Sequence, residues 1–276
     1  MMRTGLIGRN IMASRSPWLH EQEAKAQGLV LRYDLFDFTE RGLDDAALGN
    51  ILADLRAEGY AGVNVTYPFK QAVIPLLDAL ADSASLVGAV NTISMRDGQL
   101  VGHNTDLPGF QQSVLAGLAG LPLGRVLQIG AGGAGAAVAF ALLAAGAESL
   151  SIYDSDPARA EALAGKVGER WGARVTPLAL PPVDGDNHDG IVNATPVGMA
   201  AYPGTPIDPA AIEPRHWVAD IVYFPLETEL LRIAREKGCR TIDGSGMVVG
   251  QAALAFEIIT GRHADAARMR RSFQAG

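Results

Sequence analysis

Short apolar runs alternate with amphipathic stretches along most of the chain. In the first third, apolar runs at residues 4–7, 31–35 and 62–65 predict strands, and residues 17–27 and 44–58 between them have the spacing of helices. Strands that alternate with helices are typical of parallel sheets with crossover helices. The sequence therefore predicts an α/β protein.

Proline residues mark the starts of two expected helices. Pro17 follows Ser16 directly, which predicts a proline in the first helical turn and Ser16 as the helix cap. Pro68 is expected to play the same part for a helix that runs to about residue 81.

The middle of the chain has one complete βαβ pattern. An apolar run at 126–129 leads into a glycine turn at 130–135, then a helical stretch at 136–145, and a second strand at 149–153. This order predicts a doubly wound, Rossmann-type sheet. Further strands are expected at 190–193, 217–221 and 240–242, and a final helix at 250–261.

The glycine turn has the pattern of a dinucleotide-binding loop. Gly130, Gly132 and Gly135 give the spacing G-x-G-x-x-G, with Gly133 as an additional glycine. The first allows a tight turn, the second lets a pyrophosphate approach the backbone, and the third lets the helix pack closely on the sheet. The following helix N-terminus offers free N–H groups to phosphates. A purely structural turn is the alternative.

Acidic residues after the second strand favour NAD over NADP. Asp154 stands about 20 residues after the turn, where a carboxylate can accept hydrogen bonds from ribose hydroxyls. Asp154 and Asp156 would repel a ribose 2′-phosphate, and Arg159 is the only basic residue near them in the sequence. Alternatively, the two aspartates only cap the helix that begins near Pro157.

Four other segments gather short polar residues among apolar ones. They are S-R-S-P at 14–17, N-V-T-Y-P-F-K at 64–70, G-A-V-N-T at 88–92 and G-H-N-T-D-L-P-G at 102–109. Each follows a predicted strand or closes a turn. In an open parallel sheet such residues meet at the carboxyl ends of the strands, which is the usual ligand crevice.

With these motifs the chain resembles the shikimate dehydrogenase family, including its NAD-using quinate/shikimate dehydrogenase branch. The resemblance covers essentially the whole chain, and it includes G-A-G-G-A-G at 130–135, N-A-T-P-V-G-M at 193–199, V-Y-F-P at 222–225 and Asp243-Gly244. It implies an N-terminal open α/β substrate domain, residues 1–106 plus 244–276. A Rossmann-type dinucleotide-binding domain would then span residues 107–243.

The resemblance also implies roles for particular residues. Lys70 and Asp106 match the family's catalytic pair, which can relay a proton as a hydroxyl is oxidised. Ser14 and Ser16 match the pair of hydroxyls that binds the substrate carboxylate. The remaining positions implied to bind substrate are Thr66, Asn91, Asp106, Tyr223 and Gln251.

The implied cofactor is NAD, and the implied reaction is hydride transfer between shikimate and 3-dehydroshikimate, between quinate and 3-dehydroquinate, or both. The positions implied to bind NAD are Gly130, Gly132, Gly133, Ala134, Gly135, Asp154, Arg159, Thr195, Pro196, Val197, Met199, Val222 and Gly244. One departure is Gly250, where relatives often carry histidine before the late glutamine. It leaves quinate, shikimate and amino-substituted acids open as substrates.

Composition narrows the class of protein. The 276 residues are 48% hydrophobic, enough for two domain cores, and no apolar run is long enough for a membrane span. The net charge of −7 argues against a nucleic-acid partner. The single cysteine, Cys239, and the lack of a signal-peptide pattern favour the cytoplasm. The histidines have no metal-ligand spacing, so no metal is expected.

Other expectations concern assembly and alternatives. A monomer or a homodimer is expected, with the arginines at 268, 270 and 271 in a solvated last helical turn. A dehydrogenase acting on a folate or a hydroxy acid is disfavoured by the serine pair and N-V-T-x-P-x-K. A non-catalytic paralogue that senses NAD or a metabolite is disfavoured because both Lys70 and Asp106 are present. A purely structural α/β protein would leave the clustered polar residues unexplained.

Overall fold

The computed structural model describes residues 1–180 and 187–275, and the chain divides into two compact units. Unit 1 comprises Met1–Thr105 and Val249–Gly276, and unit 2 comprises Asp106–Val248. The second division falls inside helix α9 (Ser245–Thr260), whereas the sequence placed it ahead of this helix. Among the described residues, none of the helices has both the length and the apolar character needed to cross a membrane.

Unit 1 is built around a six-stranded sheet. Its elements are β1 (Met2–Gly8), α1 (Ser16–Ala26), β2 (Leu31–Asp37), η1 (Asp45–Ala47), α2 (Leu48–Ala57), β3 (Gly62–Val65), α3 (Phe69–Ala72), η2 (Ile74–Leu76), β4 (Ala79–Leu80), α4 (Asp82–Val87), β5 (Thr92–Arg96), β6 (Gln99–His103), the end of α9, and α10 (Ala266–Ala275). The strand order is β2-β1-β3-β5-β6-β4.

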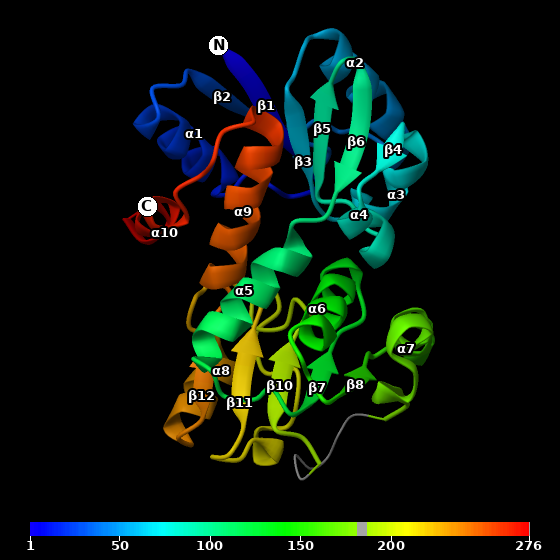
Figure 1. Ribbon diagram of the computed structural model, residues 1–276, viewed down its shortest axis with the longest axis vertical. Helices are drawn as coiled ribbons and strands as arrows, with labels where there is room; N and C mark the ends of the chain where they lie inside the picture. Colours follow the sequence, from blue (N-terminus) through cyan, green and yellow to red (C-terminus); the bar gives the residue numbers. More distant parts are fainter. Residues whose placement is uncertain (181–186, 276) are drawn as a thin grey trace. The chain divides into compact units, whose positions relative to one another are not determined.

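This sheet is mixed, which corrects the expectation of purely parallel pairing. Strands β2, β1 and β3 are parallel, but β5 runs antiparallel to both β3 and β6. Figure 1 shows β5 and β6 pointing in opposite directions. Asp97 and Gly98 join them in a two-residue turn, and both have positive φ, 50° and 74°. An Asp-Gly turn of this kind matches the twist of a hairpin, so the sequence did carry the signal.

Two predicted helix starts are also corrected. Helix α1 begins at Ser16 itself with Arg15 at the N-cap position, and the Arg15 side chain makes no capping hydrogen bond with the described residues. Ser16 is therefore not the helix cap. The helix after Pro68 covers only Phe69–Ala72, and the chain continues through η2 into β4 well before residue 81.

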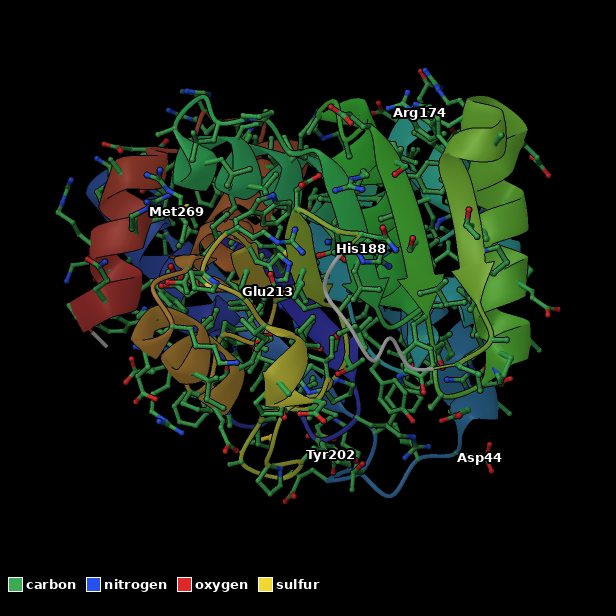
Figure 2. All side chains as sticks on the ribbon, turned by 90° about the horizontal axis from the view of Figure 1, so that it is seen from below. Asp44, Arg174, His188, Tyr202, Glu213 and Met269 are labelled. Atoms are coloured by element: carbon green, nitrogen blue, oxygen red, sulfur yellow. The ribbon has the colours of Figure 1, made fainter. Side chains whose placement is uncertain are left out.

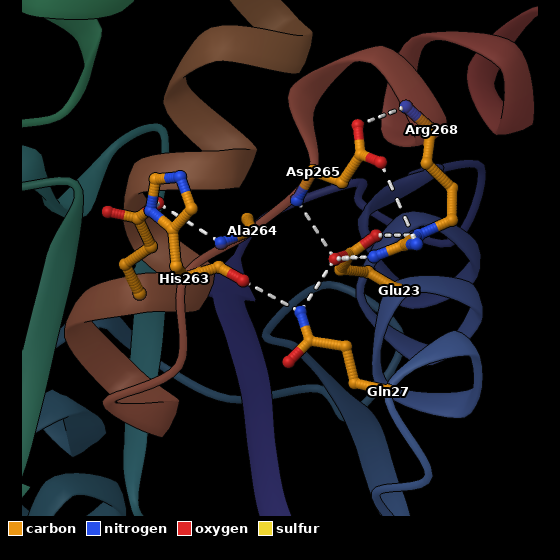
Figure 3. Close-up of polar contacts among 7 residues, drawn as sticks. Glu23, Gln27, His263, Ala264, Asp265 and Arg268 are labelled. Carbon is orange, nitrogen blue, oxygen red and sulfur yellow. Dashed lines mark hydrogen bonds and ion pairs between the residues drawn. The ribbon is translucent and has the colours of Figure 1, made fainter.

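The C-terminal helix α10 is held on α1 by a buried ion pair (Figure 3). The Glu23 side chain is fully buried and accepts hydrogen bonds from Arg268 Nε and Nη2, both at 2.7 Å. Gln27 Nε2 and the backbone N–H of Asp265 also donate to Glu23. Burial opposes the charge of Glu23, but these donors lower its pKa overall. Arg268 is therefore half-buried and paired with Glu23, whereas Arg270 and Arg271 are exposed.

Unit 2 is a doubly wound parallel sheet, which confirms the predicted Rossmann-type fold. Its elements are α5 (Asp106–Leu118), β7 (Arg125–Ile129), α6 (Gly133–Ala144), β8 (Ser149–Tyr153), α7 (Pro157–Trp171), η3 (Gly172–Arg174), β9 (Val175–Leu178), β10 (Gly190–Asn193), η4 (Pro209–Ala211), β11 (Trp217–Asp220), α8 (Glu229–Glu236), β12 (Arg240–Ile242) and the start of α9. The strand order is β12-β11-β10-β7-β8-β9, with every neighbouring pair parallel. In Figure 1 the arrowheads of β7, β10 and β11 point to the same edge of the sheet.

That strand order places a topological switch point between β7 and β10, because the chain winds outward in opposite directions from these neighbours. Helix α6, which follows β7, is buried along residues 135–143. Ligands of open α/β sheets bind at the carboxyl ends of the strands beside such a switch point.

Candidate functional site

The four polar segments of unit 1 meet at one edge of its sheet. Ser14 and Ser16 follow β1, and Thr66 follows β3. Asn91 directly precedes β5, and Thr105 comes shortly after β6. Because β5 is antiparallel, its amino end lies beside the carboxyl ends of β3 and β6, as the pairs Asn64↔Thr92 and Thr92↔His103 record. The hairpin that the sequence analysis missed therefore brings Asn91 to the predicted edge.

Asn91 is buried and bonded to residues that follow β6. Its Oδ1 accepts from the backbone N–H of Thr105 at 2.8 Å, and its Nδ2 donates to Thr105 Oγ1 at 2.9 Å. The Thr105 hydroxyl lies 3.5 Å from Oε1 of Gln251 in α9. Asn91, predicted to bind substrate, thus keeps one amide hydrogen for a ligand.

A second set of buried bonds runs through residues that sequence reasoning did not single out. Asn64 Nδ2 donates to the Asn91 carbonyl at 3.2 Å and to Thr92 Oγ1 at 3.0 Å. The Tyr33 hydroxyl donates to Asn64 Oδ1 at 2.9 Å. A polar Asn64 within the fully buried strand β3 was the available signal, because buried polar groups need partners.

The other predicted residues of unit 1 lie near this network along the chain. Thr66 is half-buried, and its backbone N–H donates to the Ile7 carbonyl at 2.9 Å, which fixes it against the end of β1. Lys70 lies in α3 and is half-buried, and its carbonyl accepts from Val90 N at 2.7 Å. That bond links the helix carrying Lys70 to the segment carrying Asn91.

Asp106 and Tyr223 lie together in unit 2. Asp106 is the first residue of α5 and is buried. Tyr223 follows β11; desolvation raises the pKa of its hydroxyl, and the negative charge of Asp106 raises it further. Lys70 belongs to unit 1 and Asp106 to unit 2, so the assignment of these two residues as a catalytic pair stays a prediction.

The glycine turn of unit 2 is tight at its first and third glycines and open at the second. A Cβ on Gly130 would lie 2.7 Å from the Ala194 carbonyl oxygen, and Gly130 has φ +105°. A Cβ on Gly135 would lie 2.4 Å from the Gly130 carbonyl oxygen. A Cβ on Gly132 would meet none of the described atoms within 4 Å. This difference fits a turn whose middle glycine faces an approaching pyrophosphate.

Two buried side chains hold this turn in shape. Gln128 Nε2 donates to the carbonyl oxygens of Gly130 and Gly135, both at 2.8 Å. Asp154 accepts from the backbone N–H of Ala131 at 2.7 Å and from that of Asp156 at 2.9 Å. Asp154 was expected to meet a ribose, and a carboxylate with these two bonds retains further acceptor sites. Gln128 was not predicted.

The charges beyond β8 form one exposed cluster. Asp156 caps helix α7 by accepting from Ala158 N at 3.1 Å. Arg159 lies 3.5 Å from Asp156 Oδ2, and both side chains are exposed. Arg159, the basic residue predicted near the adenosine ribose, therefore already lies beside the carboxylate of Asp156.

The loop after β10 is held by a buried polar cluster under it. Asn193 Oδ1 accepts from the backbone N–H and the hydroxyl of Thr195, and Asn193 Nδ2 donates to the Val197 carbonyl and to Asp220 Oδ1. Desolvation raises the pKa of Asp220 to about 6, against hydrogen bonds from Thr228, Val222 N–H and Asn193. Sequence reasoning missed Asp220, which ends β11.

Two of the predicted cofactor residues on this loop lie at the surface of unit 2. Pro196 and Met199 are exposed, and the turn that carries them ends at Tyr202, which lies at the periphery in Figure 2. Val222 is buried directly after β11. A Cβ on Gly244 would lie 2.6 Å from the Val222 carbonyl oxygen, so the backbones at these two predicted positions run in close contact.

Comparisons with known proteins agree with this architecture. Residues 6–93 match the family model of the shikimate dehydrogenase substrate binding domain, and residues 244–272 match that of the shikimate 5'-dehydrogenase C-terminal domain. The chain is 48% identical to a shikimate dehydrogenase (NADP(+)) of Arthrobacter sp., covering 98% of this chain and 93% of that protein. It is 45% identical to a quinate/shikimate dehydrogenase (NAD(+)) of Corynebacterium efficiens, covering 98% and 96%.

Solved structures give the same result. The quinate dehydrogenase from Corynebacterium glutamicum in complex with NAD superposes with a TM-score of 0.91 at 41% identity, covering 100% of this chain and 99% of that one. The shikimate 5-dehydrogenase from Thermus thermophilus in complex with NADP(H) and shikimate gives 0.88 at 35% identity, covering 100% and 99%. These relatives differ in the cofactor and the acid that their names state.

Proposed function

The chain belongs to the shikimate dehydrogenase family, and we propose that it is an NAD-dependent oxidoreductase that interconverts shikimate and 3-dehydroshikimate, quinate and 3-dehydroquinate, or both. The observation that carries this proposal is the polar edge of the unit 1 sheet. There Ser14, Asn91 and Gln251 offer hydroxyl and amide groups, and a polyhydroxylated ring acid requires such donors and acceptors.

We assign the substrate carboxylate to the two serines that follow β1. A hydroxyl that donates to a carboxylate makes a charge-assisted bond, worth about 1.5–3 kcal/mol. Thr66, Asn91 and Gln251 would orient the ring hydroxyls, and Tyr223 would contribute from unit 2.

We assign the proton transfer to Lys70 and Asp106. When an alcohol is oxidised, the carbon loses a hydride and the oxygen loses a proton, so a group beside the oxygen must take the proton up. The Lys70 amino group would accept it in the oxidation direction and return it in the reduction direction. Asp106 would orient the hydroxyl and Lys70.

The residues of unit 2 fit a nicotinamide dinucleotide. When bound, the dinucleotide supplies the acceptor or donor of the hydride. The open Gly132 and the N-terminus of α6 would receive the pyrophosphate, and Thr195, Val197 and Val222 would lie on the nicotinamide side. Asp154 and Asp156 favour NAD, because both would repel a 2′-phosphate and Arg159 is already beside Asp156.

The test measures initial rates with purified protein, offering NAD or NADP with quinate or shikimate. We expect kcat/KM with NAD to exceed that with NADP by about tenfold or more, which corresponds to about 1.4 kcal/mol. Asp154→Ala should reduce this preference more than Asp156→Ala does, because Asp156→Ala removes the second carboxylate but leaves the bond from Ala131 N to Asp154 intact. Equal use of NADP would contradict the cofactor assignment. Binding of NAD without turnover of either acid would favour a sensing paralogue.

A further inference from the structure

The amide of Asn64 has a defined orientation, because it faces a backbone carbonyl. The carbonyl oxygen of Asn91 can only accept a hydrogen bond, so the Asn64 atom 3.2 Å from it is the amide nitrogen Nδ2. Asn64 Oδ1 then accepts from the Tyr33 hydroxyl at 2.9 Å. Asn64 Nδ2 also lies 3.0 Å from Thr92 Oγ1, and an amide nitrogen can only donate. The Thr92 oxygen is therefore an acceptor on this side.

The amide of Asn91 is oriented in a similar way by a backbone N–H. The N–H of Thr105 can only donate, so the Asn91 atom 2.8 Å from it is the oxygen Oδ1. Asn91 Nδ2 then lies on the other side of the amide, where it donates one hydrogen to Thr105 Oγ1 at 2.9 Å. Its second hydrogen is the one that Asn91 keeps for a ligand.

Thr92 joins the two amides. Its hydroxyl oxygen accepts from Asn64 Nδ2 and lies 3.2 Å from Asn91 Oδ1. Because the Asn91 oxygen cannot donate, the single hydrogen of Thr92 points to it. Thr92 is fully buried, with an exposed fraction of 0%, so it acts on a ligand only through its neighbours.

This network opposes any turning of the Asn91 amide. If the oxygen and nitrogen of the amide changed places, the nitrogen would face the N–H of Thr105, so that two donors would meet. The Thr92 hydroxyl would also lose the acceptor for its hydrogen. Buried donors without acceptors are costly. The network therefore holds Asn91 with a donor, and not an acceptor, toward the ligand.

We propose that Thr92 is a positioning residue whose hydroxyl holds the Asn91 amide with its nitrogen toward the ligand, so that this part of the site receives a ring oxygen and rejects a ring ammonium group. The proposal rests on the proposed function, which supplies the polyhydroxylated acid. A hydroxyl oxygen can accept from Asn91 Nδ2, whereas an ammonium group offers only hydrogens and meets a donor there. Aliphatic amines are protonated at neutral pH, so the amino-substituted acids are disfavoured at this position.

The first experiment tests the Thr92 hydroxyl in the full-length protein. Thr92→Val keeps the branched shape and removes the hydroxyl, and Thr92→Ser keeps the hydroxyl. The dissociation constants of shikimate and quinate are measured by calorimetry, with KM and kcat beside them. We expect Thr92→Val to weaken acid binding about threefold to tenfold, and Thr92→Ser to stay within about twofold of wild type. Equal losses in the two variants would overturn the role of the hydroxyl.

The second experiment tests the orientation of Asn91 with matched ligands, the shikimate analogues in which each ring hydroxyl in turn is replaced by an amino group. We expect wild type to bind the analogue whose amino group meets Asn91 about tenfold or more weakly than shikimate. Asn91→Ala should remove this discrimination. Asn91→Asp should reverse it, because aspartate keeps an acceptor for Thr105 N–H and Thr92 but presents a second acceptor to the ligand.

A merely structural role for Thr92 predicts a different result. Thr92→Val should reduce the discrimination against the one analogue that Asn91→Ala identifies, whereas general damage would affect all three analogues alike. If Thr92→Val does not fold, Thr92→Ala takes its place.

Discrimination that persists in Asn91→Ala, or that Asn91→Asp does not reverse, would overturn the orientation of Asn91 and leave the proposed function intact. A wild-type protein that neither binds nor turns over shikimate or quinate would overturn the proposed function, and this inference with it.

Discussion

The polar edge of unit 1 and the glycine turn of unit 2 use buried polar side chains differently. At the edge, side chains bond to one another, as Tyr33 does to Asn64 and Asn91 does to Thr105. At the glycine turn, side chains bond to the backbone, as Gln128 does to Gly130 and Gly135 and Asp154 does to Ala131. In the proposed function, unit 1 presents side chains to a ligand, whereas unit 2 presents a loop whose shape its side chains maintain.

This difference follows from what each unit is proposed to bind. A small ring acid offers hydroxyls at several angles, and side chains can meet each of them individually. A pyrophosphate is met by backbone N–H groups at a helix N-terminus, which requires glycines and a fixed turn. Substitutions in unit 1 should therefore change recognition of the acid, and those in unit 2 should change the shape of the nucleotide loop.

The largest expected effect is a pH dependence of the free energy of unfolding, which has opposite signs for a group in unit 1 and a group in unit 2. Burial lowers the pKa of His20 in unit 1 from 6.5 to about 4, and it raises that of Asp220 in unit 2 from 3.8 to about 6. Below pH 6.5 the unfolded chain protonates His20 while the folded protein does not, so this group removes stability as pH falls towards 4. Asp220 has the opposite effect. As pH falls from 6 towards 3.8, the folded protein protonates Asp220 while the unfolded chain does not, so this group adds stability.

Each group should shift the free energy of unfolding by about 3 kcal/mol across its window. Urea unfolding at several pH values from 4 to 7 tests this with His20→Leu and Asp220→Asn. Relative to wild type, His20→Leu should become more stable as pH falls, and Asp220→Asn as pH rises. His263→Leu is the control, because 91% of that side chain is exposed. Shifts of the same sign in both variants would contradict the assignment.

The next effect concerns chemistry in unit 1. Lys70→Ala should lower kcat by about a hundredfold or more, the usual size of an acid–base contribution, and should leave the NAD dissociation constant unchanged. Steady-state kinetics and NAD titration measure the two quantities. Lys25→Ala, at an exposed position of α1, is the matched control. A loss confined to KM would make Lys70 a binding residue.

A smaller effect is expected at the ion pair between Glu23 in α1 and Arg268 in α10, which joins the two stretches of chain that form unit 1. Arg268→Ala should lower the free energy of unfolding more than an ordinary surface substitution does, because the buried Glu23 carboxylate would lose two hydrogen bonds from a charged partner. Arg270→Ala, at an exposed position in the same helix, should change it by about 0.5 kcal/mol or less. Similar losses in both variants, measured by urea unfolding, would rule out a specific role for the ion pair.

The smallest effect tests the nucleotide loop of unit 2. A methyl group at Gly132 meets none of the described atoms, so Gly132→Ala should leave the melting temperature unchanged. The same methyl would face the pyrophosphate and should weaken NAD binding about tenfold. Gly135→Ala is the comparison, because its Cβ would clash with the Gly130 carbonyl and lower the melting temperature. Unchanged NAD affinity in Gly132→Ala would place the phosphates elsewhere.

Part of the fold could be predicted because it depends on local pattern. The strands at 62–65, 149–153, 190–193 and 240–242 were predicted with the bounds that the structure has. Each is a short apolar run between turn residues, and such runs need no distant partner to be recognised. The glycine turn was equally local, since its spacing and its flanking elements lie within one βαβ unit.

The sequence by itself determined the α/β class and the dinucleotide fold, because periodicity and motif spacing express them directly, and its motifs carried the resemblance to the family. Tertiary structure alone decided which partner each polar side chain takes. Ser16 was expected to cap its own helix, but the helix begins at Ser16 itself, and the backbone N–H of Ser16 donates to Ser14 Oγ. Gln128 and Asp220 stand as polar residues in or at the end of strands, but the sequence could not name their partners, since these lie on loops that approach them only after folding. A hydroxyl or an amide can satisfy its hydrogen bonds in many ways, and the packing of distant segments selects one.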